Sequence, residues 1–426
     1  MANSFNDPTF FTKAALAMLH SKSVVVRSLN RQYDDQFAKS GGKIGASLSI
    51  RKPNKFAVTT GRNLGTQDMT ESSTTLTCAT QIHVPLYFTS AELSLSIDDF
   101  SSRYLEPSMA QMAATFDYNV LSGLVPKVWN IADPTQTSAA SLTMTVLPDS
   151  LITWANAGAK LDIGLAPRDG NRTALVSPFH QSALMDALKS LVNPAAKISG
   201  QYDNGLMGNA IDLNFKLCPK VYGFTTGSRT NTTPLITGTT TTNGTTTLDF
   251  DGGSTSGTTK VGDRFSIEDC YMVDPETKQS TGRLQQFVVV ANASSSQYAA
   301  ATGYTASSGA VTAMAFSPAI YTSGVNQNVT STGLVNDKGI WNIGIASTSY
   351  TQNLIGHRDW ATVVTADLEV PKGVDFAARQ QFEGVSMRVV RAYDINSDNF
   401  PIRLDILYGF KELYPEWACV VAGDAA

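Results

Sequence analysis

Apolar residues recur every three or four positions in two parts of the chain and predict two amphipathic helices. The first follows Asp7 and Pro8, and the second ends before Pro126. Pro8 and Pro107 each suit the first turn of a helix. Two more helices are predicted over 148–161 and 178–191, with Ser177 as an N-cap candidate. The apolar positions of the first two helices are Phe11, Ala14, Ala15, Leu16, Met18 and Leu19, and Met109, Met112, Ala113, Phe116, Val120, Leu121 and Leu124.

Apolar and polar residues alternate with period two over 43–51 and again over 74–88, which predicts two half-buried strands. The 22 residues between them, 52–73, are rich in Gly, Thr, Asn and charge, and offer few apolar anchors, among them Phe56 and Val58. A connection this long without a core of its own is unusual inside a compact domain. We therefore predict a projecting β-ribbon whose tip is ordered by a neighbouring subunit.

Threonine dominates the middle of the chain, with 16 Thr among residues 225–259 and no charged residue over 230–248. Thr favours strands, and Asn243-Gly244 is a turn signal. Strand-like segments follow at 260–267, 285–291 and 310–316. We predict a separate small β domain from Phe224 to about Tyr321, inserted after a mixed α/β region.

The C-terminal part returns to clear alternation. Strands are predicted over 360–370, 385–392 and 400–408, and the last two flank the polar link DINSDN. Together they indicate an antiparallel hairpin with one buried face.

Length and charge narrow the class of protein. A chain of 426 residues exceeds the roughly 250 to 300 residues of a single core, so two or more domains are expected. Charged residues are only 16%, against about 25% in ordinary soluble proteins, which suggests that other chains cover part of the surface. A net charge of −4 disfavours tight, charge-driven binding to nucleic acid. No signal peptide and no membrane-spanning segment is indicated.

The motifs of common catalytic and metal sites are incomplete. In the Gly-rich segment DGGSTSGTTK, Thr258 stands where a phosphate-binding loop needs Lys, and Thr255 stands where a nucleophile elbow needs Ser. The four His and four Cys share no local spacing typical of a zinc site or a disulfide framework. Adjacent acids such as Asp98-Asp99 point apart on a helix or strand, which suits a solvated surface better than a catalytic pair. We predict no catalytic residue, no cofactor and no metal.

The order of these elements resembles the major capsid proteins of tailed double-stranded DNA bacteriophages, the HK97-like fold. Within that group the chain is similar to the coat proteins of P22-like podoviruses, which carry an inserted β-barrel domain. Essentially the whole chain takes part in the resemblance. Its more specific segments are DFSSRYLEPSMAQMAATFDYNVL (99–121), GQYDNGLMGNAIDLNF (200–215), KVGDRFSI (260–267) and QNLIGHRDWATVVTADLEVP (352–371).

The resemblance implies an α+β fold divided along the chain. It implies an N-terminal arm over 1–39, an extended loop over 40–89, the spine helix of a peripheral domain over 90–130, an axial domain over 131–222, an inserted β domain over 223–322, a return through the axial domain over 323–361, and a peripheral β-sheet with the C-terminus over 362–426. The uncharged tract at 230–248 departs from coat proteins that carry a charged loop there, so the corresponding two-fold contact is not expected.

The function implied is a major capsid protein that self-assembles into the icosahedral shell, first as a procapsid and then as the mature head, enclosing the phage DNA. The implied partners are copies of the chain itself as pentamers and hexamers, a separate scaffolding protein, a portal protein and double-stranded DNA bound non-specifically, with no membrane. Assembly would take place in the host bacterial cytoplasm, and the protein would reside in the virion.

Four cations of the extended loop are the candidates for charged intersubunit contacts: Arg51, Lys52, Lys55 and Arg62. Charges at a solvated tip explain the same residues equally well. The competing class is a Thr-rich β adhesin or glycan-binding structural protein, which residues 225–320 favour but the long helix does not. An enzyme is a third class, and no constellation of residues supports it.

Overall fold

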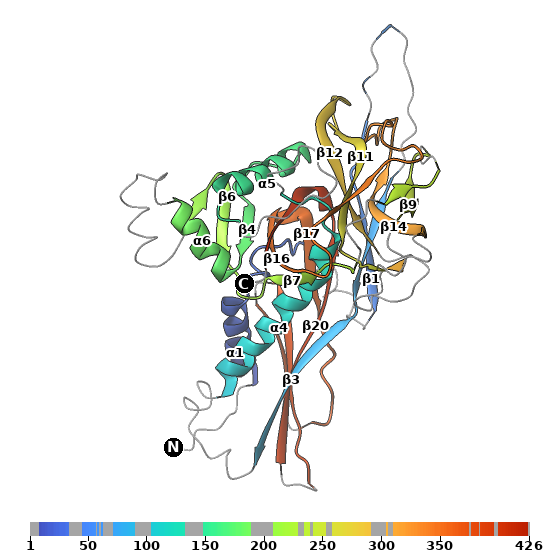
Figure 1. Cartoon of the computed structure of the whole chain (residues 1–426). Coiled ribbons are helices and arrows are strands. Elements are labelled where there is room, and N and C mark those ends of the chain that lie inside the picture. The colour runs from blue at the N-terminus through green and yellow to red at the C-terminus, as the bar shows by residue number, and fades with distance from the viewer. Residues whose placement is uncertain are drawn as a thin grey trace. The chain divides into compact units, whose positions relative to one another are not determined.

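The computed structural model is mixed α and β, which confirms the predicted α+β class (Figure 1). It describes residues 8–33, 45–56, 58, 61–62, 71–89, 104–132, 148–188, 208–228, 234–238, 242–252, 258–290, 304–305, 310–374, 376–382, 384–395 and 399–424. The chain divides into two compact units, which are described separately: Met1–Lys52 with Glu71–Leu121 and Ala361–Leu413, and Pro53–Thr70 with Ser122–Trp360 and Tyr414–Ala426.

The first unit is built on an antiparallel sheet from the C-terminal part of the chain. Its order is β17-β20-β19-β18, and β3 pairs with β20 as well (Figure 1). The strands are β3 (Thr80–Thr89), β17 (Ala361–Ala366), β18 (Phe376–Phe382), β19 (Val385–Arg391) and β20 (Asn399–Glu412). The predicted hairpin of 385–392 with 400–408 is confirmed, because β19 and β20 pair antiparallel, for example Val389 with Leu404.

Both predicted N-terminal helices form and cover this sheet. They are α1 (Pro8–Lys22) and α4 (Glu106–Leu124), which ends before Pro126 as predicted. All seven apolar positions predicted for α4 are buried. Phe116 of α4 packs on Tyr408 of β20 with ring centroids 4.6 Å apart, and His20 of α1 meets the edge of Phe382 in β18.

The strand predicted over 74–88 is two strands. Residues Ser73–Cys78 form β2, which pairs with β1 (Ala46–Arg51), and β3 begins at Thr80 and pairs with β20. The prediction of one continuous strand was wrong because the alternation runs unbroken through the change of partner at Ala79. Residues 43 and 44 of the other predicted strand lie outside the described part of the chain.

The second unit contains a sheet in the order β21-β16-β4-β6-β5, with β7 also pairing with β16. We call it the axial sheet. Its strands are β4 (Arg172–Val176), β5 (Asn209–Ala210), β6 (Leu213–Leu217), β7 (Tyr222–Thr225), β16 (Ser349–His357) and β21 (Ala418–Asp424). The helices α5 (Leu151–Ile163) and α6 (Pro178–Leu188) accompany it, and Trp154, Leu161, Val176, Ile355 and Val421 belong to the same core. Ser177 caps α6, because its Oγ accepts the backbone N–H of His180 at 3.3 Å.

Within the second unit, strands between residues 235 and 343 form a closed β-barrel, which we call the inserted barrel. Its strand order is β15-β11-β12-β14-β9-β8, and β8 meets the segment that leads into β15 through the Ile236 N–H to Lys338 carbonyl bond of 2.9 Å and the Ile340 N–H to Pro234 carbonyl bond of 2.7 Å. Phe265, Phe287 and Phe316 pack against one another inside it. The strands are β8 (Leu235–Ile236), β9 (Thr245–Asp251), β11 (Arg264–Val273), β12 (Ser280–Val289), β14 (Val311–Ile320) and β15 (Ile340–Ile343), with a separate pair β10 (Thr258–Thr259) and β13 (Tyr304–Thr305).

Two strands lie in other sheets than the sequence suggested. The barrel sheet continues beyond residue 322, since β15 pairs with β11, and the C-terminal strand β21 joins the axial sheet by pairing with β16 rather than the peripheral sheet. Both pairings join segments far apart in the chain, which periodicity does not report. The described residues also include the short 3-10 turns η3 (Val125–Lys127), η4 (Arg358–Trp360) and η5 (Pro415–Trp417). Among the described residues, no helix is both long enough and apolar enough to cross a membrane.

Candidate assembly surface

The predicted β-ribbon is formed by β1 and β2, which pair antiparallel from Ala46 with Cys78 to Arg51 with Ser73. Backbone bonds extend the pairing at both ends, from the Gly45 N–H to the Cys78 carbonyl at 2.7 Å and from the Lys52 N–H to the Ser72 carbonyl at 2.8 Å. The ribbon therefore continues as paired backbone toward its tip.

The base of the ribbon is packed against its own sheet. Leu76 and Cys78 are fully buried, and Ile50 is 8% exposed. A Cβ added at Gly409 of β20 would stand only 2.2 Å from the Thr77 carbonyl oxygen, so β20 and β2 are in close contact. This part of 43–88 is thus held by its own chain.

The distal part of the ribbon is different. Phe56 is 68% exposed and Val58 is 94% exposed. Apolar side chains of this size are costly to leave in water, by about 1.5 to 3 kcal/mol each relative to burial. Their positions mark a surface that the described part of this chain does not cover.

The four candidate cations lie along the same ribbon. Arg51 forms an ion pair with Glu71 across it at 3.1 Å, with both side chains more than half exposed, so the pair adds little stability. Lys52 is half-buried, and Lys55 and Arg62 are exposed. Lys55 also lies close enough to Lys278 of the barrel to help burial lower the pKa of Lys278. The structure thus gives Arg51 a partner within the chain and leaves Lys55 beside a second cation.

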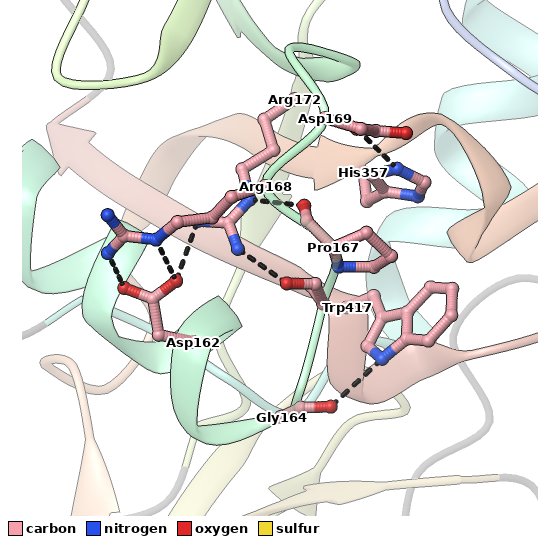
Figure 2. A network of polar contacts seen from close by, with 9 residues as sticks. Asp162, Gly164, Pro167, Arg168, Asp169, Arg172, His357 and Trp417 are labelled. Atoms are coloured by element: carbon pink, nitrogen blue, oxygen red, sulfur yellow. Dashed lines mark hydrogen bonds and ion pairs between the residues drawn. The ribbon is translucent and has the colours of Figure 1, made fainter.

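A polar network that the sequence did not single out shapes the loop after α5 (Figure 2). Buried Arg172 of β4 donates to the carbonyls of Ala166 and Pro167 at 2.6 and 3.0 Å and pairs with Asp162 at 2.8 Å. Arg168 pairs with the same carboxylate, and its hydrogen bond is the main reason that the pKa of Asp162 lies below its usual range.

The other half of this network centres on buried His357 (Figure 2). Its Nε2 lies 3.1 Å from an Asp169 carboxylate oxygen, and its Nδ1 accepts the Asp359 N–H at 3.2 Å. Although burial opposes it, hydrogen bonds from Asn171 and His357 lower the pKa of Asp169 to about 2. The Trp417 indole N–H donates to the Gly164 carbonyl at 2.9 Å. Each of these groups contributes a hydrogen bond that holds the loop after α5.

Metal-ligating side chains and thiols are the remaining groups to consider in the part of the chain that the structure describes. No group of three or more His, Cys, Asp and Glu side chains comes together there. All four cysteines are buried, and burial raises the pKa of Cys270 and of Cys419 to about 12. Such thiols are protonated and shielded at neutral pH.

Solved structures similar to the chain over most of its length come from phages and a virus-like particle. A Mycobacterium phage Che8 chain is 10% identical, with 93% of this chain and 90% of that chain covered at a TM-score of 0.45. A chain from the capsid of Cyanophage P-SCSP1u is 11% identical, with 90% and 84% covered at 0.42. A chain from the virus-like particle of Pyrococcus furiosus is 7% identical, with 97% of each chain covered at 0.39.

A search of curated protein sequences finds no match. The family model described as P22 coat protein, gene protein 5, matches residues 233–422, somewhat less than half of the chain. The matched range includes the barrel strands, β16 and β17 to β20, and it contains two of the four segments on which the resemblance was stated, 260–267 and 352–371. Over residues 233–422 the chain is therefore similar to the P22 coat protein, in line with the resemblance stated from the sequence.

Proposed function

We propose that the protein builds an icosahedral phage head from pentamers and hexamers of itself, and that the ribbon is the part that joins neighbouring copies. The observation that carries this proposal is the contrast within the ribbon. Its base is buried on its own sheet, while Phe56 and Val58 near its tip are 68% and 94% exposed. Side chains left open in this way gain about 25 cal/mol per Å² when a neighbour covers them, and the gain repeats at every copy of a closed shell.

Charge fits the same role. Lys55 and Arg62 extend beyond the Arg51–Glu71 pair and are the cations best placed to meet an acidic surface of a neighbour. The remaining surfaces of each subunit belong to the peripheral sheet, the axial sheet and the inserted barrel. These are the parts that the domain divisions expected from the sequence distinguish. The net charge of −4 suits an inner wall that holds DNA without binding it tightly.

The remaining parts of the proposal concern partners and place. A separate scaffolding protein guides the procapsid, a portal protein occupies one vertex, and double-stranded DNA is enclosed non-specifically. Assembly takes place in the cytoplasm of the host bacterium before the head matures. The role is structural and not catalytic, and an adhesin is not favoured, because the coat-protein match includes the β domain that suggested it.

The test is assembly of ribbon variants. Val58→Ser removes an exposed apolar side chain at the ribbon, and Val335→Ser makes the same change at a residue of the second unit that is 40% exposed. Each variant is produced with the scaffolding candidate and examined by electron microscopy and sedimentation. We expect Val58→Ser, alone or with Phe56→Ser, to lower the yield of closed shells at least tenfold while the soluble subunit keeps its thermal stability.

The Val335→Ser control is expected to assemble as the unchanged protein does. Equal shell yields for all variants would contradict the role of the ribbon. A stable monomer that forms no shells under any condition, even with the scaffolding candidate, would contradict the capsid assembly itself.

A further inference from the structure

Two side chains of the inserted barrel point out of its strands and are buried outside it. They are Arg264 of β11 and Gln286 of β12, which are 2% and 1% exposed. β11 and β12 are neighbours in the barrel, with Arg264 opposite Val288 and Ser266 opposite Gln286. Both side chains reach residues 125–132, which we call the connector because they lead from the end of α4 toward the axial sheet.

Arg264 binds the connector through its backbone. Its Nε donates to the Val128 carbonyl at 2.8 Å, and its Nη2 donates to the Val125 carbonyl at 3.1 Å. Its Nη1 donates to Oε1 of Gln352 in the axial strand β16 at 2.7 Å. The guanidinium therefore joins barrel, connector and axial sheet at one point. Val125 begins the turn η3 and Val128 follows it, and the Val125 carbonyl also accepts the Val128 N–H at 3.2 Å. Carbonyls at the C-terminal end of a helix carry partial negative charge, which suits the guanidinium.

The charge of Arg264 is retained in this site. Burial lowers its pKa to about 10, which still leaves it protonated at neutral pH. Removing the guanidinium would leave the Gln352 and Val128 oxygens buried without this donor, and a buried polar group without its hydrogen-bond partner is destabilising.

Gln286 binds the connector as a strand would. Its Nε2 donates to the Ile131 carbonyl at 3.0 Å, and its Oε1 accepts the Ile131 N–H at 2.9 Å. The same Oε1 lies 3.3 Å from Nζ of Lys160 in α5, which is 6% exposed. The Gln286 amide thus bonds both to the connector and to α5, a helix that packs against the axial sheet.

The other side of the connector is bonded to the C-terminal strand β21. Ala132 donates to the Val420 carbonyl at 2.8 Å, and Val420 donates to the Asn130 carbonyl at 2.9 Å. Asn130 in turn donates through Nδ2 to the Ala418 carbonyl at 3.2 Å. The connector is therefore held between the two barrel side chains and the axial sheet, with hydrogen bonds on both sides.

We propose that the inserted barrel is a clamp, in which Arg264 and Gln286 lock the connector onto the axial sheet so that barrel and axial sheet move as one body. A domain joined only through its linkers would be expected to pivot on them. Here the barrel is joined to the axial sheet by buried polar groups. All of these groups would have to lose their hydrogen-bond partners before the barrel could pivot. The clamp fixes the direction of the barrel on every subunit, so that whatever the barrel contacts in a shell is met in the same geometry.

Hydrogen exchange of the full chain, read by mass spectrometry, tests the clamp. The variants are Arg264→Met and Gln286→Met, and the control is Arg283→Met at an exposed position of β12. We expect exchange in peptides covering residues 128–132 and 418–424 to rise at least tenfold in both variants and to stay unchanged in the control. Unchanged exchange in these peptides, with either variant folded, would overturn the proposal.

A measurement on the unchanged protein decides the matter if neither variant folds. Exchange is followed against urea concentration for the barrel strands β9 and β14 and for residues 128–132. A clamp requires both regions to lose protection at the same urea midpoint. Loss of the barrel at a lower midpoint, with residues 128–132 still protected, would show a separable domain and contradict the clamp.

Discussion

In the antiparallel sheet of the first unit, which we call the peripheral sheet, one buried carboxylate pairs with two arginines. Asp405 of β20 is fully buried and pairs with Arg388 at 2.6 Å and with Arg403 at 2.5 Å. Arg388 is 18% exposed and Arg403 is 48% exposed, so the two partners differ in how much water screens them. The inner pair should therefore matter much more to stability than the outer one.

Asp405→Ala is expected to lower the free energy of unfolding by about 3 kcal/mol, because it leaves the shielded Arg388 charge without its carboxylate. Arg403→Ala should cost less than about 1 kcal/mol, since its guanidinium stays half in solvent. Urea denaturation of the two variants measures both values. Equal losses would show that the carboxylate is not held chiefly by Arg388.

A second buried carboxylate, Asp117 of α4, holds the turn after α1. It accepts the Ser23 hydroxyl and, at 3.0 Å, the Val24 N–H. Burial outweighs these bonds and raises the pKa of Asp117 from 3.8 to about 6. The folded protein thus binds this proton more tightly than the unfolded chain does. The resulting stabilisation is fully present below pH 4 and is lost as pH rises through 6.

Asp117→Asn should remove this pH dependence. Relative to the variant, we expect the unchanged protein to lose up to about 3 kcal/mol of unfolding free energy between pH 4 and pH 6.5, because one pKa unit corresponds to about 1.4 kcal/mol. Urea denaturation of both proteins at several pH values gives the difference. Parallel pH profiles would contradict a raised pKa at Asp117.

At the scale of elements, local pattern predicted the helices well because their signals are local. The apolar spacing of α4, the proline that follows its last turn and the Ser177 cap of α6 all act within a few residues. The same reasoning joined β2 and β3, since alternation continues through Ala79 and says nothing about which strand is the partner. The placements of β15 and β21 were missed for the related reason that their partners lie far away in sequence.

The same distinction between local signals and distant partners applies to the candidate residues. The ribbon could be predicted from a long polar connection between two alternating segments, and the contact role of its four cations stays a prediction. Arg264 could not, because an arginine at the start of a strand is usually solvated, and only the fold shows that connector carbonyls and Gln352 surround it. The Asp162–Arg172 pair is another case, in which two ordinary surface residue types turn out to hold a loop.

The close contact between ribbon base and sheet can be tested at Gly409. A Cβ there would meet the Thr77 carbonyl at 2.2 Å, so Gly409→Ala should destabilise the protein by about 1 to 3 kcal/mol. Gly223→Ala in β7 is the matched control, because no atom lies within 4 Å of its added Cβ. Thermal or urea denaturation compares them. A variant at Gly409 as stable as the control would mean that the ribbon base is not fixed on β20.

At the scale of the whole molecule, the proposed assembly rests on a subunit that would be incomplete alone. Only 16% of its residues are charged, and its ribbon exposes apolar side chains near the tip. A subunit of this kind gains stability from its neighbours, and many weak contacts sum to a stable closed shell. The clamp proposed at the inserted barrel would hold the barrel and the axial sheet of each copy in one fixed arrangement.

Hydrogen exchange of residues 52–62 in assembled particles and in isolated subunits tests this account most directly. These residues include Phe56, Val58 and the cations Lys52, Lys55 and Arg62. The account predicts that their amides, apart from the Lys52 N–H that is bonded to the Ser72 carbonyl, exchange at least tenfold more slowly in assembled shells than in the isolated subunit. Equal exchange in both states would show that no neighbour covers the ribbon and would contradict its role in joining subunits.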